Sequence, residues 1–125
     1  MKKVITASGA PAAIGPYSHA ISVGDFLYTS GQIALDPATG KIAGETIEEQ
    51  TKQVFSNLKA VLAANDMTFE NVVKTTVFLI DLNDFAAVNA IYATYFSAQP
   101  PARSCVQVAG LPGGSKLEIE LVACK

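Results

Sequence analysis

Hydrophobic and polar residues repeat with two different periods along the chain, and these periods separate strands from helices. Period-two alternation and β-branched runs predict strands over residues 4–6, 19–23, 26–30, 72–80, 103–108 and 117–123. Apolar residues at helical spacing predict one helix from Thr46 to about Ala64 and another over residues 85–96. The buried stripe predicted for the second helix consists of Phe85, Val88, Tyr92, Tyr95 and Phe96. The order is therefore strand, hairpin, helix, strand, helix, strand, strand. This order predicts an α+β domain with two helices on one side of a mixed sheet.

The boundaries of these elements carry recognisable signals. Thr46 and Glu49 have the spacing of a capping box, in which each side chain bonds to the other residue's backbone N–H. Gly24-Asp25 forms the turn of a predicted hairpin, and Pro100-Pro101 ends the second helical unit. The run 72–80 is apolar on both faces, which is typical of an interior strand.

The strand over residues 103–108 contains Arg103, the only arginine in the chain. Its planar guanidinium can bind a carboxylate or phosphate through two parallel hydrogen bonds, whereas a lysine ammonium cannot. Ser104, Val106 and Val108 alternate with Arg103 and Cys105. We expect the first, more apolar set to face the core, which would put Arg103 and Cys105 on the opposite face.

The last strand carries Glu118 and Glu120 on one face and its apolar residues on the other. The preceding connection, residues 109–116, is rich in turn formers and too short for a helix, so we expect strands 103–108 and 117–123 to be antiparallel neighbours. If their apolar sets share a face, Arg103 lies near a carboxylate that can order or deprotonate a water. A cross-strand ion pair on a solvated surface is the structural alternative.

Composition and charge restrict the class of protein. The chain has 125 residues, enough for one domain, and 50% of them are hydrophobic. We therefore expect a partner chain to cover some apolar surface and the protein to be a homo-oligomer. A net charge of -2 offers no electrostatic footprint for nucleic acid or an anionic membrane. Two cysteines without CxxC spacing, and no signal peptide, indicate free thiols in the cytoplasm.

Few residues are available for metal or cofactor chemistry. His19 is the only histidine, which excludes most zinc and iron sites and a Ser-His-Asp relay. Its place at a strand edge is typical of a surface residue. The Gly113–Lys116 segment has phosphate-loop letters in the wrong order, so we expect no cofactor and no metal. Cys105 has no histidine to activate it as a nucleophile, which favours a packed thiol.

Three further residues could serve either a ligand or the fold. Tyr17 follows Pro16 in a loop and is either a packed ring or a hydroxyl donor. Gly31 lacks a Cβ and lets the backbone approach a ligand closely. Asn89 lies at the edge of the second helix's apolar stripe, where its amide makes either a helix-to-loop hydrogen bond or a ligand contact.

Six motifs in order resemble the RidA (YjgF-type) family of enamine/imine deaminases along essentially the whole chain. They are Ala-Ile-Gly-Pro-Tyr at 13–17, Thr-Ser-Gly-Gln-Ile at 29–33, Lys-Thr-Thr-Val-Phe at 74–78, Asp-Leu-Asn-Asp-Phe-Ala at 81–86, Pro-Ala-Arg-Ser-Cys-Val at 101–106 and Leu-Glu-Ile-Glu at 117–120. The resemblance implies a chorismate-mutase-like fold and a homotrimer with clefts between subunits.

The same resemblance implies hydrolysis of 2-iminobutanoate and 2-iminopropanoate to 2-oxo acids and ammonia. Arg103 would hold the substrate carboxylate, Glu118 would hold the attacking water, and Glu120 would be a less direct neighbour. The cleft-lining positions implied by the resemblance are Tyr17, Ser30, Gly31, Asn89 and Cys105. A trimer that binds small carboxylates without turnover is the alternative. A ribonuclease is disfavoured by the acidic charge and the absence of a basic stripe.

Overall fold

The computed structural model describes residues 1–125, and its elements follow the predicted order with one addition, a two-residue strand. The strands are β1 (Lys3–Ile5), β2 (Ala20–Val23), β3 (Phe26–Thr29), β4 (Gln32–Ile33), β5 (Val72–Leu79), β6 (Ala102–Gln107) and β7 (Leu117–Cys124). The helices are α1 (Ile47–Ala63) and α2 (Phe85–Tyr95), with short 3-10 turns at Phe69–Asn71, Leu82–Asp84 and Pro112–Gly114. The unpredicted strand is β4.

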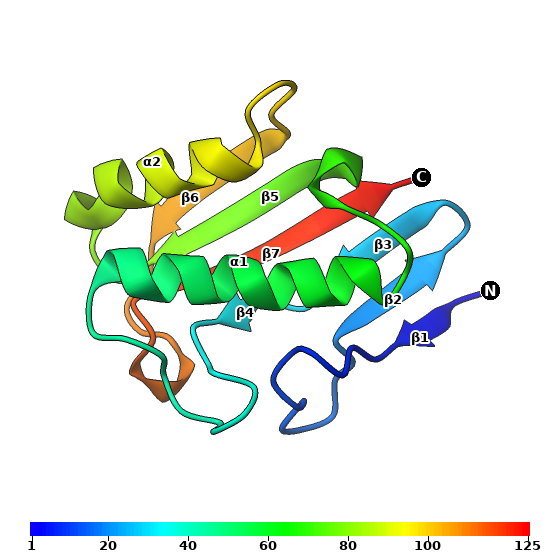
Figure 1. Cartoon of the computed structure of the whole chain (residues 1–125), viewed down its shortest axis with the longest axis horizontal. Coiled ribbons are helices and arrows are strands. Elements are labelled where there is room, and N and C mark those ends of the chain that lie inside the picture. The colour runs from blue at the N-terminus through cyan, green and yellow to red at the C-terminus, as the bar shows by residue number, and fades with distance from the viewer.

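All seven strands form one mixed sheet in the order β1-β2-β3-β7-β5-β6, with β4 pairing with β7. The pair β5 and β6 is parallel, and the other pairs are antiparallel. Both helices lie on one face of the sheet, and the other face carries no helix (Figure 1). This arrangement confirms the predicted α+β fold. Neither helix combines the length and the apolar character that a membrane span requires.

Helix α1 begins at the predicted capping box. The Thr46 hydroxyl oxygen accepts a hydrogen bond from the Glu49 backbone N–H at 3.1 Å, and Glu49 Oε1 accepts one from the Thr46 N–H at 3.3 Å. Hydrogen bonds from Thr46 are the main reason that the pKa of Glu49 lies below its usual value. The two bonds satisfy donors that the first helical turn leaves free.

The hydrophobic core lies between the two helices and the sheet. Phe55 of α1 is fully buried and forms its aromatic centre. Its ring stacks on Tyr95 with centroids 4.2 Å apart and meets the edge of Tyr92 at 5.9 Å. Aromatic pairs of this kind stabilise a core beyond the area they bury. They also fix the ring of Tyr92, which contacts the guanidinium of Arg103.

The predicted pairing of the last two long strands is wrong, because β5 lies between β6 and β7. Helix α2 connects β5 to β6 as a crossover, and such a connection puts the second strand parallel to the first. The chain then continues past β5 through residues 108–116 and returns as β7 on its other side. The turn-rich connection is thus a bridge across β5 and not a hairpin.

The predicted orientation of β6 is also wrong. Arg103 and Cys105 are half-buried on the helix-bearing face, whereas Ser104 and Val106 are exposed on the open face. β6 is an edge strand that pairs only with β5, and its Arg103 side chain contacts α2. Apolar character along this strand therefore does not indicate the core.

The open face of the sheet exposes large apolar side chains on β1, β3 and β6. Val4 is 55% exposed, Tyr28 48%, Val106 44% and Phe26 42%. Val4 and Tyr28 lie in one row across the sheet, since both pair with Ile21. Monomeric proteins rarely leave so many large apolar residues together on one face. The feature agrees with the expectation that another chain covers part of this surface.

Candidate functional site

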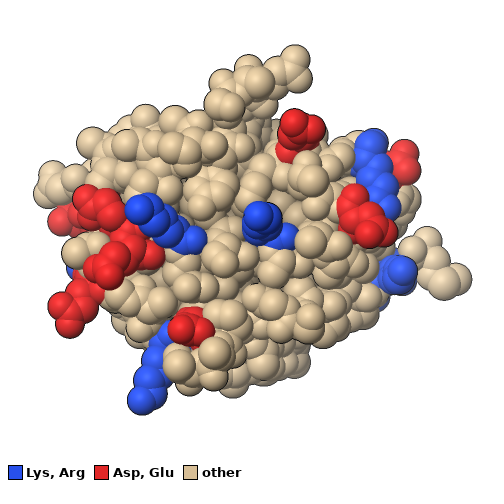
Figure 2. All heavy atoms as spheres, in the orientation of Figure 1, with Lys and Arg blue, Asp and Glu red and all other residues tan.

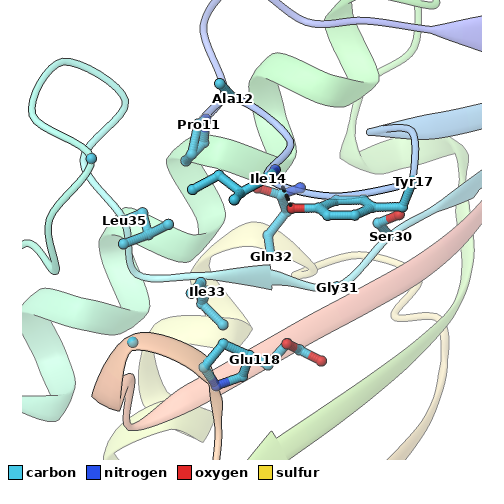
Figure 3. Close-up of a pocket in the computed structure, with 13 residues that line it drawn as sticks. Pro11, Ala12, Ile14, Tyr17, Ser30, Gly31, Gln32, Ile33, Leu35 and Glu118 are labelled. Atoms are coloured by element: carbon cyan, nitrogen blue, oxygen red, sulfur yellow. Dashed lines mark hydrogen bonds between the residues drawn. The ribbon is translucent and has the colours of Figure 1, made fainter.

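A cavity of about 610 Å³ opens beside β4 and is lined by three separate parts of the chain. The loop before β2 contributes Tyr17, the segment around β4 contributes Ser30 and Gly31, and β7 contributes Glu118. Figure 3 shows Tyr17 and Ser30 toward one end of this cavity, with the Glu118 carboxylate turned to the same end. Four of the predicted site residues therefore lie together.

His19 holds the loop that forms one wall of the cavity. It is 6% exposed, so the expectation of a surface histidine is wrong. Its Nδ1 accepts a hydrogen bond from the Ala7 N–H at 3.0 Å, and its Nε2 donates to the Pro11 carbonyl oxygen at 2.7 Å. A buried polar ring needs such partners, and in this loop they tie residues 7–11 to β2.

The polar end of the cavity is shaped by local hydrogen bonds. Ser30 Oγ donates to the Ser18 carbonyl oxygen at 2.6 Å, which joins the start of β4 to the loop before β2. The Tyr17 hydroxyl accepts a hydrogen bond from the Ile14 N–H at 3.4 Å. The Tyr17 side chain is 50% exposed and is not packed in the core, contrary to the structural alternative for this residue. It is available to a ligand.

Glu118 lies directly against the backbone of Gly31. A Cβ added to Gly31 would be 2.5 Å from Glu118 Oε2 and 2.6 Å from its carboxyl carbon. Burial raises the pKa of the Glu118 carboxyl above its usual value, and the negative charge of Glu120 adds to this effect. A carboxylate with a raised pKa is better matched to proton transfer near neutral pH.

Replacing Gly31 by alanine tests the close approach. We expect the added methyl group to displace the flexible Glu118 carboxylate, so that ligand turnover falls about tenfold or more, while the melting temperature changes by less than about 3 °C. Gly110→Ala is the matched control, because a Cβ there meets nothing within 4 Å. Equal activity of both variants would show that the contact has no functional role.

The raised pKa of Glu118 has a consequence for stability. Its ionised form costs the folded state free energy, fully above the raised pKa, and the cost disappears as the pH falls below the ordinary value of 4.5. We expect Glu118→Gln to raise the melting temperature at pH 7 by up to about 4 °C. This gain should vanish near pH 4 in thermal unfolding followed by circular dichroism. A gain that persists at pH 4 would show that ionisation of Glu118 is not its cause.

The remaining predicted residues form a second group on β6 and α2. Arg103 Nη1 donates a hydrogen bond to Asn89 Oδ1 at 2.9 Å. The Asn89 amide thus contacts a strand, which neither alternative for this residue had anticipated. Cys105 packs partly against the core, and burial raises the pKa of its thiol despite the nearby Arg103 charge. A raised thiol pKa disfavours a thiolate nucleophile.

Within one chain the two groups lie on opposite faces of the sheet. Arg103 pairs with Thr75 on the helix-bearing face, and Glu118 pairs with Phe78 on the open face. The expectation that Arg103 and the glutamates share a face is therefore wrong. Because side chains alternate along a strand, no adjustment of rotamers brings the two groups together.

Sequence reasoning missed the apolar end of the cavity. Pro11, Ile33 and Leu35 line it, and Figure 3 shows them at the end away from Tyr17 and Ser30. The Gly- and Pro-rich loops that line the cavity can be recognised as loops in the sequence, but nothing in the sequence placed them beside β7.

On the face that carries the helices, Lys and Arg lie among Asp and Glu without a continuous basic stripe (Figure 2).

Known proteins are similar to this chain along nearly its whole length. A RutC family protein of Synechocystis is 58% identical, with 97% of this chain and 95% of that protein covered. The mouse 2-iminobutanoate/2-iminopropanoate deaminase is 51% identical, with 98% and 91% covered. The crystal structure of E. coli TdcF with bound serine has a TM-score of 0.94 at 43% identity, with 98% of each chain covered.

A sequence model of one family, described as endoribonuclease L-PSP, matches residues 7–125. This match includes both groups of candidate site residues, and the relatives above agree with it over the same length. The chain therefore belongs to the endoribonuclease L-PSP family, which is the RidA (YjgF-type) family that its motifs resemble.

Proposed function

We propose that this protein is a cofactor-free deaminase that hydrolyses 2-iminobutanoate and 2-iminopropanoate at a site shared by two copies of the chain. The observation that carries the proposal is a complementary pair of groups. Arg103 is held by Asn89 without a carboxylate partner, and Glu118 has a raised pKa and lines the cavity. The name of the mouse relative supports the substrate class, and serine bound to E. coli TdcF supports an amino-acid-like ligand.

Two copies are required because Arg103 and Glu118 point to opposite faces of one sheet. β6 is the edge strand, so Arg103 lies at the rim of the molecule, where it can reach a neighbouring copy. The apolar open face supplies a surface for such a neighbour, with Phe26, Tyr28 and Val106 exposed on it. A closed ring of three copies, as the family resemblance implies, repeats the same contact at every interface.

Each group has a separate task in the proposed reaction. The Arg103 fork binds the carboxylate of the 2-imino acid and fixes the position of its imine carbon. Glu118 of the adjacent copy orders a water and takes a proton as the water oxygen adds to that carbon. Glu118 then returns that proton to the nitrogen of the resulting carbinolamine and accepts the hydroxyl proton as the carbon–nitrogen bond breaks, so that ammonia and a 2-oxo acid leave.

A coupled assay tests the activity. A threonine dehydratase generates 2-iminobutanoate in the presence of semicarbazide, which traps the imine as a semicarbazone that absorbs light. We expect the wild-type protein to reduce the rate of semicarbazone formation in proportion to its concentration. Semicarbazone formation equal to that in buffer, with folded oligomeric protein, would refute the proposed activity. In that case binding of 2-oxobutanoate would support the alternative, a non-catalytic trimer that binds small carboxylates.

The description of the family as an endoribonuclease favours RNA cleavage as a second candidate. The net charge of -2 opposes it, since RNA binding depends on neutralising phosphates with Lys and Arg. We expect no RNA cleavage by protein that has been purified until its imine-hydrolysis rate per milligram no longer changes. Cleavage that co-elutes with the oligomer and disappears in Arg103→Ala would establish this second activity.

A further inference from the structure

We propose that Phe85 and Tyr92 are positioning residues that form an aromatic cradle for Arg103 and thereby set the affinity of the site for carboxylates. This inference rests on the proposed role of Arg103 as the anchor of the substrate carboxylate. It assigns a role to two rings of α2 that the proposed reaction does not use.

The cradle is built by one face of α2. Phe85, Asn89 and Tyr92 follow one another at positions i, i+4 and i+7, so they lie along one side of the helix. The guanidinium carbon of Arg103 is 4.6 Å from the centroid of the Tyr92 ring and 5.3 Å from that of the Phe85 ring. Both distances lie within the range of about 6 Å at which a ring face attracts a cation.

The way Arg103 is held leaves most of its donors free. A ring attracts the guanidinium through its face and occupies none of its five N–H donors. The Asn89 amide oxygen accepts from Nη1 only. An aspartate or glutamate at this place would occupy two donors and neutralise the charge. The cradle instead orients a cation that is still able to bind an external carboxylate.

Tyr92 is fixed by the core beneath it. Its hydroxyl oxygen is 2.7 Å from Thr75 Oγ1, and both residues are buried. Thr75 is the register partner of Arg103 on the neighbouring strand. The hydrogen bond therefore holds the Tyr92 ring beside the backbone position from which the Arg103 side chain extends. Burial raises the pKa of the Tyr92 phenol, which is therefore neutral at physiological pH. A fixed platform reduces the entropy that Arg103 loses when it binds a ligand.

Phe85 has no comparable structural reason to be aromatic. It is 38% exposed, although the spacing of apolar residues had placed it in the buried stripe of the helix. Tyr92, further along the helix, packs in the core against Phe55 and Phe96. The exposed Phe85 ring contacts the sheet through the guanidinium of Arg103. This difference makes Phe85 the cleaner residue for a test.

The test compares Phe85→Leu and Tyr92→Leu, which remove a ring, with Phe85→Trp and Tyr92→Phe, which keep one. Binding of 2-oxobutanoate is measured by calorimetry, and KM and kcat are measured in the imine assay. We expect about a threefold to fivefold weaker affinity for Phe85→Leu and about tenfold for Tyr92→Leu, with Phe85→Trp within about twofold of wild type. Tyr92→Phe keeps the ring but loses the bond to Thr75, so its affinity should lie between those of wild type and Tyr92→Leu. KM should rise by the same factors while kcat changes little, because the cradle acts on binding.

Wild-type affinity in a folded Phe85→Leu variant would overturn the inference, and this variant decides the matter if Tyr92→Leu fails to fold. A general loss of stability would lower kcat and the melting temperature together with the affinity, which separates a structural role from positioning. The wild-type imine assay tests the proposed function independently. If it shows no turnover, the affinities of the variants for 2-oxobutanoate still test the cradle, and no binding by wild type would overturn it.

Discussion

We expect imine hydrolysis to fall by about a hundredfold to a thousandfold in kcat/KM when Arg103 is replaced by alanine. The chain contains no other arginine, so no second guanidinium can take over the carboxylate. Losing a charged, bidentate partner costs about 3–4 kcal/mol of transition-state binding, which corresponds to this factor in rate. The semicarbazide assay measures the loss directly.

Arg103→Lys is the matched variant for this prediction. It keeps the positive charge but loses the planar fork that binds two carboxylate oxygens at once, so we expect about a tenfold loss and not full activity. The oligomeric state and melting temperature of both variants should stay close to wild type, because the Arg103 side chain is only half-buried. Undiminished turnover in Arg103→Ala would show that another group holds the carboxylate.

Much of the secondary structure could be predicted because local chemistry decides it. The capping box at Thr46 and the turn at Gly24-Asp25 start or end elements through contacts between near neighbours. The interior position of β5 followed from apolar residues on both of its faces, and the structure confirms it. These signals act within a few residues, so tertiary packing did not override them.

The arrangement of the site could not be predicted, because it depends on which elements meet in space. Alternation in β6 showed correctly that Arg103 and Cys105 share a face, but not which face. The more apolar face of β6 is the exposed one, which is understandable if another chain covers it. The burial of His19 likewise depends on a loop whose backbone supplies both of its partners.

Mixing two inactive variants gives the most direct test of a site shared between copies. By the proposed roles, Arg103→Ala lacks the carboxylate anchor and Glu118→Gln lacks the base that takes a proton from water, so each alone should retain about one per cent of wild-type activity or less. In the proposed trimer, reassembled from equal amounts of both variants, a site is intact only when each neighbour supplies its unmodified group. Random assembly makes about one site in four intact.

The matched control mixes wild type with the double variant Arg103→Ala/Glu118→Gln in equal amounts. A shared site again predicts about a quarter of the wild-type activity, whereas a site within one chain predicts about a half. The deciding measurement is the imine-hydrolysis rate of the mixed single variants after reassembly. A site formed by two copies predicts recovery to about a quarter of the wild-type rate. A rate that remains at the level of the separate variants would contradict such a site.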